Sequence, residues 1–119
     1  MTLQATPLLD NTRALAFLGG DGEVLVELLQ TFLQEAIGEL AAYRAALAQP
    51  SRADMLRYLH RLVPTLAIIA TAELHAEARG LYETLQSPDE PLEAHLPRAL
   101  ALARQMDTLL AETRAQLSR

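Results

Sequence analysis

The segment that decides the fold is residues 25–47, LVELLQTFLQEAIGELAAYRAAL. Its apolar side chains recur at steps of three and four, which places them on one face of a helix and predicts a long amphipathic α-helix. Asp21 precedes this helix as its expected N-cap, and Gln49-Pro50 ends it. The apolar stripe consists of Leu25, Leu28, Leu29, Phe32, Leu33, Ala36, Leu40, Tyr43 and Leu47.

The same spacing predicts a helix on either side of this segment. Upstream, Asp10 is the expected N-cap of a short helix over residues 11–18, which Gly19-Gly20 ends. Downstream, Ser51 opens a third helix, and Asp54 three residues later resembles the second member of a capping box. The apolar stripe of the third helix is Met55, Leu56, Leu59, Leu62, Val63, Leu66 and Ile69.

Two further helices are expected in the last third of the chain. Thr71 is the expected cap of a fourth helix that runs to about residue 86, although neither Gly nor Pro marks this boundary. Residues 87–91, SPDEP, form a clear break. A fifth helix is expected over residues 91–117, with an irregular first turn at Pro97. Its apolar stripe is Leu96, Leu100, Ala103, Met106, Leu110 and Leu117.

Four substantial helices with short connections therefore follow one brief helix. Short connections make neighbouring helices antiparallel, and four amphipathic helices can close around one core. The predicted fold is all-α, an antiparallel four-helix bundle with a short extra N-terminal helix, in one domain over residues 1–119. The first eight residues carry few signals and are expected to form a loose lead-in.

Composition excludes several classes of function. The formal net charge is −5, so the phosphate backbone of a nucleic acid would repel this chain. There is no cysteine, which rules out disulfides, thiolate nucleophiles and Cys-ligated zinc. No apolar run approaches the roughly 18 residues of a membrane span, and no signal peptide is evident. We therefore expect a cytoplasmic protein without nucleic-acid or membrane partners.

His60 is the residue that stands out chemically. With Leu59 at the centre of the buried face, a turn of about 100° per residue brings His60 to the edge of that face. Ala53 and Ala67 lie almost in line with His60, while Arg57, Arg61 and Pro64 lie on its solvent side, and Ile68 projects outward near the same lane. The helix geometry predicts an accessible imidazole with small neighbours and two guanidinium groups beside it.

These features suit a phosphoryl acceptor. A histidine ring is largely neutral and nucleophilic near neutral pH, and it must be reached by the active site of another protein. Once phosphorylated, it gains negative charge that nearby Arg side chains can stabilise by charge-assisted hydrogen bonds. The competing interpretation is a half-buried surface histidine without a role.

The other two histidines are weaker candidates. His75 lies in a stretch that resembles a solvated helical face, and His95 lies between two prolines in a first turn expected to be poorly ordered. No two histidines have the spacing of a helical zinc site, so no metal and no cofactor are expected. A metal-binding bundle that uses acidic residues such as Glu35 and Glu39 is a distant alternative, because no inward-facing ligand set is evident.

Residues 59–70, LHRLVPTLAIIA, resemble the His-x-Leu-Lys-Gly helix of the histidine-phosphotransfer family. Residues 15–25 and 28–33 are similar to the start of that family's first and second helices. The resemblance covers roughly residues 9–85, and the last helix matches only in length and pattern. The resemblance implies a four-helix module that carries a phosphoryl group on His60 between receiver domains of response regulators or hybrid histidine kinases in two-component signalling. Such a carrier is not an enzyme, because the receiver supplies Mg²⁺ and most of the catalysis.

This chain departs from the family pattern at two positions. The usual Lys three residues after the histidine is Val63, and the usual Gly four residues after it is Pro64. Phosphate stabilisation is therefore assigned to Arg57, Arg61 or Arg44, and partner docking to Pro64, Ala67 and Ile68. Pro64 cannot donate a hydrogen bond to the carbonyl of His60, so a kink is expected at the turn that carries the histidine. The alternative function is a related module that binds receivers, or another partner, without accepting phosphate.

Overall fold

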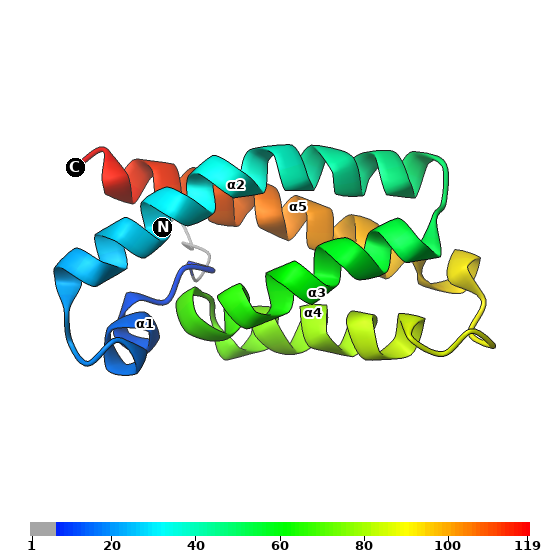
Figure 1. The fold of residues 1–119 in the computed structure, drawn as a ribbon, viewed down its shortest axis with the longest axis horizontal. Helices are drawn as coiled ribbons and strands as arrows, with labels where there is room; N and C mark the ends of the chain where they lie inside the picture. Colours follow the sequence, from blue (N-terminus) through cyan, green and yellow to red (C-terminus); the bar gives the residue numbers. More distant parts are fainter. Residues whose placement is uncertain (1–6) are drawn as a thin grey trace, which may run out of the picture.

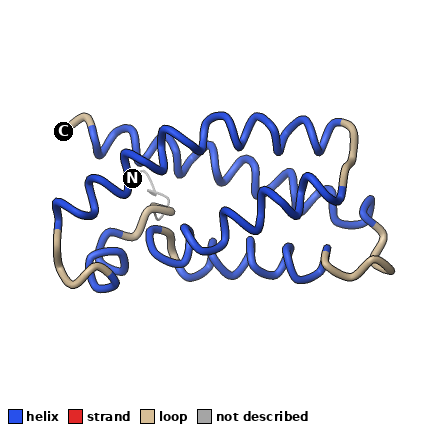
Figure 2. The backbone as a smooth tube through the Cα atoms, viewed as in Figure 1, coloured by secondary structure: helices blue, strands red, loops and turns tan. Residues whose placement is uncertain are grey.

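Within residues 7–119, which the computed structural model describes, every regular element is a helix and there is no strand (Figure 2). The all-α prediction is thus confirmed for this part of the chain. The helices are α1 (Asn11–Phe17), α2 (Gly22–Ala48), α3 (Arg52–Ile69), α4 (Ala72–Leu85) and α5 (Leu92–Leu117). Their bounds agree with the predicted ranges to within one residue at nearly every end.

The four longer helices lie side by side and alternate in direction along the chain (Figure 1). α2 packs against α3 and α5, and α4 packs against the same two helices from the other side. α1 lies across the end of this arrangement, where it contacts α3 and α2. α3 therefore has neighbours on both flanks, which decides the surroundings of His60.

The predicted N-caps form. The side chains of Asp10, Asp21 and Thr71 each accept a hydrogen bond from a backbone amide in the first turn of α1, α2 and α4. Gly19 and Gly20 have φ of +70° and +83°, a left-handed conformation that suits glycine and lets the chain reverse between α1 and α2. The capping residues and the two glycines therefore predicted the starts of α1, α2 and α4 and the turn between α1 and α2 correctly.

Only half of the predicted capping box forms at the start of α3. The Ser51 hydroxyl accepts from the Asp54 amide at 3.3 Å. The Ser51 amide, however, donates to the carbonyl of Ala46, so it is not available to the Asp54 carboxylate. Asp54 is also one methylene shorter than the usual Glu, and its carboxylate accepts from Arg57 instead.

The expectation of a loose lead-in over residues 1–8 is wrong for Leu8, and residues 1–6 lie outside the described residues. The Leu8 amide donates to the Glu112 carboxylate at 2.9 Å, and its carbonyl accepts from the Thr71 amide at 2.9 Å. This pairing occupies a backbone amide that would otherwise be unsatisfied where α3 ends and α4 begins. A long-range contact thus explains a helix boundary that no Gly or Pro marks.

The buried face of α5 differs from the predicted stripe. Leu100 was expected in the core but is 43% exposed, whereas Ala99, Leu102 and Leu109 are buried. The reason is that α5 packs against both α2 and α4, so its buried face is wider than a single stripe and is displaced from Leu100. The helix also continues through Pro97, and the irregular turn expected there is not seen.

Two tyrosines join α2 and α3 in the core. The rings of Tyr43 and Tyr58 stack with centroids 4.3 Å apart. The Tyr43 hydroxyl donates to the carbonyl of Ala99 at 3.1 Å, whereas the Tyr58 hydroxyl is buried without a hydrogen-bond partner among residues 7–119. Burial raises the pKa of both hydroxyls, so both remain neutral.

This asymmetry predicts different effects of removing each hydroxyl. Tyr43→Phe removes the hydrogen bond to the Ala99 carbonyl and should lower the free energy of unfolding by about 1 kcal/mol. Tyr58→Phe removes only an unpartnered polar group, so the free energy of unfolding should stay the same or rise by up to about 1 kcal/mol. Urea denaturation followed by circular dichroism measures both, and an equal loss in the two variants would contradict the assignment.

Candidate functional site

His60 lies in the middle of α3 with its side chain exposed, while the preceding Leu59 is 0% exposed. The position at the edge of the buried face therefore agrees with the helix geometry. Leu62 and Leu66 lie on the buried side of α3, and they hold this part of the helix against the core. These buried leucines thus hold the backbone that carries the imidazole against the core, although the ring itself faces solvent.

Within residues 7–119, the ring of His60 has one hydrogen-bond contact, with Tyr82 of α4. Its Nδ1 lies 3.2 Å from the Tyr82 hydroxyl oxygen, and the two ring centroids are 6.0 Å apart with the planes tilted by 41°. Sequence reasoning missed Tyr82. Its place beside the buried Leu81 marks it as an edge residue of α4, but only the packing of α3 on α4 brings it to His60.

Arg57 and Arg61 lie on the solvent side of α3, one turn apart and flanking His60 in sequence. Arg57 pairs with Asp54 at 3.1 Å within α3, and Arg61 reaches across to Glu39 of α2 at 3.3 Å. The side chains of Arg57 and Arg61 remain 68% and 64% exposed. Exposed pairs of this kind contribute only about 0–1 kcal/mol, so either guanidinium can exchange its carboxylate for another anion at small cost.

Arg44 has a different environment. Its guanidinium makes a bidentate pair with Asp107 of α5, on the side of α2 that packs against α5. The hydrogen bond from Arg44 holds the pKa of the Asp107 carboxyl below its usual value and raises the pKa of Arg44. Arg44 therefore has a partner on α5 and, within the described residues, no hydrogen bond to His60, and its assignment to phosphate stays a prediction.

The residues predicted for docking differ in exposure. Pro64 is exposed and Ala67 is half-buried. Ile68 was expected to form an exposed apolar spot, and this is wrong, because it is half-buried and packs against the core. α3 remains helical through Pro64, and a kink at this proline stays a prediction. Val63 also packs partly against the core.

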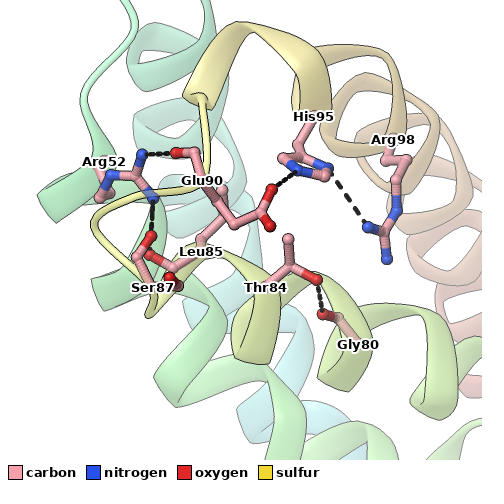
Figure 3. A network of polar contacts seen from close by, with 8 residues as sticks. All are labelled: Arg52, Gly80, Thr84, Leu85, Ser87, Glu90, His95 and Arg98. Carbon is pink, nitrogen blue, oxygen red and sulfur yellow. Dashed lines mark hydrogen bonds and ion pairs between the residues drawn. The ribbon is translucent and has the colours of Figure 1, made fainter.

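The other histidines are engaged in the fold. His95 was expected in a poorly ordered turn, but it lies within α5 with 17% of its side chain exposed. Its Nε2 lies 3.0 Å from the Glu90 carboxylate, and its Nδ1 lies 3.5 Å from the Arg98 guanidinium (Figure 3). His75 is half-buried rather than solvated, and burial lowers the pKa of its ring, with Arg13 and Arg79 contributing.

The same view shows why the α4–α5 connection holds its shape. Arg52, at the start of α3, donates to the carbonyls of Leu85, Ser87 and Glu90 (Figure 3). These carbonyls follow or end α4 and have no partner within that helix. Arg52 and His95 both contact Glu90, so the polar contacts of His95 belong to the packing of the α4–α5 connection.

A groove of about 740 Å³ runs between α2 and α3 beside the site. Arg61 and Glu39 line it together with Thr65 and Glu35, so it is polar at its rim. Among residues 7–119, no three His, Asp or Glu side chains converge as metal ligands would. Within the same residues, no helix is both long and apolar enough to cross a membrane.

Comparisons with known proteins bear on the fold. No family model matches the sequence, and no curated protein matches it. Among solved structures, the chain is similar to the HPT domain from the Hpt sensor hybrid histidine kinase of Shewanella, with a TM-score of 0.85 and 19% sequence identity. The similarity covers 92% of this chain and 93% of that domain. The fold of this chain is thus the helical fold of that HPT domain.

The different surroundings of His60, His75 and His95 predict that the three rings differ in reactivity toward diethyl pyrocarbonate, which acylates unprotonated ring nitrogens. His60 should react first, because its Nε2 has no partner in the described part of the chain, whereas both nitrogens of His95 are engaged. Mass spectrometry of peptides from a time course measures the three rates. A His60→Gln variant should lose the fastest phase, and faster modification of His95 would contradict the assignment.

Proposed function

We propose that this chain is a phosphorelay carrier that accepts and donates a phosphoryl group at His60. The observation that carries the proposal is an exposed imidazole in the middle of α3, in a chain whose fold is that of an HPT domain. In this proposal α2 to α5 are the four-helix bundle of the phosphotransfer module and α1 is its short extra N-terminal helix. The module comprises one domain over residues 1–119.

The transfer needs no catalytic group from this chain beyond the imidazole. A lone pair of His60 bonds to the phosphorus of a phosphoaspartate, the P–O bond to that aspartate breaks, and the carboxylate leaves with the electron pair. The receiver supplies Mg²⁺, which neutralises charge on the phosphoryl oxygens. The chain is accordingly a carrier rather than an enzyme, and the reverse step returns the phosphoryl group to another receiver.

Arg57 and Arg61 are the residues we assign to the phosphoryl group, in place of the family's Lys. Both side chains are more than three-fifths exposed, and within residues 7–119 each pairs with one carboxylate, that of exposed Asp54 or half-buried Glu39. A phosphoryl group on His60 carries more negative charge than Asp54 or Glu39, so it competes well for these guanidinium groups. Arg44 is the weakest of the three candidates because Asp107 holds it.

The partner is expected to dock around His60. Pro64 and Ala67 offer small apolar contacts, and half-buried Ile68 adds a smaller one than a fully exposed side chain would. Arg57 and Arg61 face the acidic pocket in which a receiver binds Mg²⁺. The proposed partners are response-regulator receivers or a hybrid histidine kinase, which would meet this chain in the cytoplasm.

A second candidate function follows from Val63 and Pro64, which stand where the histidine-phosphotransfer pattern has Lys and Gly. Val63 packs partly against the core, so it offers nothing to a phosphate. If Arg57 and Arg61 do not replace the missing Lys, the chain binds receivers without accepting the phosphoryl group. Direct labelling of His60 distinguishes this interaction module from a carrier.

The labelling experiment uses the full chain and phosphorylated receivers from the same genome. Transfer should produce a label that is labile in acid and stable in base, and peptide mapping should place it on His60. His60→Gln should abolish the label, while His75→Gln and His95→Gln retain it. Absence of label with every receiver, together with measurable binding of one, would support the interaction module instead.

Separate Arg57→Ala and Arg61→Ala variants test the phosphate assignment. Each should slow transfer to His60 by about five- to tenfold, because a charge-assisted hydrogen bond contributes more than about 1 kcal/mol. Arg44→Ala should have the smallest effect of the three candidates, and Arg114→Ala on α5 is the control for loss of one positive charge. Transfer rates unchanged in all three candidates would rule out the assignment.

A further inference from the structure

The contact between His60 and Tyr82 restricts the chemistry of the imidazole. A neutral imidazole has one N–H and one lone pair, and the hydrogen bond at one nitrogen decides which nitrogen keeps the lone pair. At His60 the Nδ1 side is occupied by the Tyr82 hydroxyl at 3.2 Å. The Nε2 side has no partner within residues 7–119, so it is the nitrogen that an incoming group can reach.

We propose that Tyr82 is a positioning residue: its hydroxyl oxygen accepts a hydrogen bond from Nδ1–H of His60 and leaves the Nε2 lone pair directed at the partner. The reverse arrangement, in which Tyr82 donates to Nδ1, puts the proton on Nε2 and leaves the ring without an accessible lone pair. The Tyr82 side chain is only half-buried, so its own proton can be donated to water.

The same contact favours the product of the transfer. When Nε2 bonds to phosphorus and the carboxylate leaves, the ring keeps the proton on Nδ1 and gains positive charge. The hydrogen bond from Nδ1–H to Tyr82 then becomes charge-assisted and stronger than it was in the neutral ring. Tyr82 therefore stabilises the phosphorylated state more than the free state, which lowers the barrier.

The geometry of the scaffold supports this role. His60 is carried by a turn of α3 whose Leu59 is fully buried, and Tyr82 follows Leu81 of α4, which is 1% exposed. Both residues are therefore attached to backbone that the core holds in place. The tilt of 41° between the rings excludes face-to-face stacking and is compatible with an in-plane bond at Nδ1.

The tautomer of His60 can be measured without any phosphate, so the role of Tyr82 in selecting it is tested independently of phosphotransfer. Only the effect of Tyr82 on phosphorylation rests on the proposed function. Long-range ¹H–¹⁵N NMR at about pH 8, where an ordinary imidazole is neutral, reports which nitrogen carries the proton. The unmodified chain should show a protonated Nδ1 in His60, and Tyr82→Phe should move the population toward Nε2–H. Tyr58→Phe, which removes a hydroxyl that has no partner, is the matched control and should leave the spectrum unchanged.

Phosphorylation by phosphoramidate tests the consequence without a receiver, because Nε2 attacks phosphorus and ammonia leaves with the electron pair of the broken P–N bond. ³¹P NMR should find the phosphoryl group on Nε2, and Tyr82→Phe should slow the reaction about tenfold while Tyr58→Phe does not. An Nε2–H tautomer in the unmodified chain, or a tautomer ratio unaffected by Tyr82→Phe, would overturn the inference and leave the proposed function standing. Failure of every receiver to label His60, with the NMR result as expected, would overturn the proposed function alone.

Discussion

Leu59 has no exposed surface, and its burial fixes the direction in which His60 points, because a helix turns by about 100° from one residue to the next. Met55, Leu62 and Leu66 extend the same buried face along α3. Any rotation of α3 that hid the imidazole would bring one of these leucines into water, at a cost of about 1.5–3 kcal/mol for each side chain. Packing of the hydrophobic core thus holds the imidazole of His60 at the surface.

The flanks of α3 give the two sides of His60 different characters. On the side toward α2, Arg61 reaches Glu39 beside a polar groove. On the side toward α4, the ring meets Tyr82. Within residues 7–119, the Tyr82 hydroxyl occupies Nδ1 and Nε2 has no partner, which is the arrangement that the proposed phosphoryl transfer requires.

Charge explains how the chain can differ from the family pattern and still support the proposed chemistry. Val63 and Pro64 take the positions of a Lys and a Gly, so the usual cation is missing from that face of α3. Arg57 and Arg61 lie on the neighbouring face, in exposed pairs that are weak individually. In an otherwise acidic chain, two exposed arginines thus flank His60, where the acidic pocket of the proposed partner would approach.

The sequence by itself determined the helices, their caps and the position of His60 at the edge of a buried face, because apolar spacing and capping chemistry act within a few residues. It did not reveal the Tyr82 contact, the partner of Arg44, the burial of Ile68 or the displaced face of α5. Each of these depends on the register of one helix against another, which is set by packing across the core. The boundary between α3 and α4 also needed the tertiary structure, since Leu8 supplies a backbone partner from the far end of the chain.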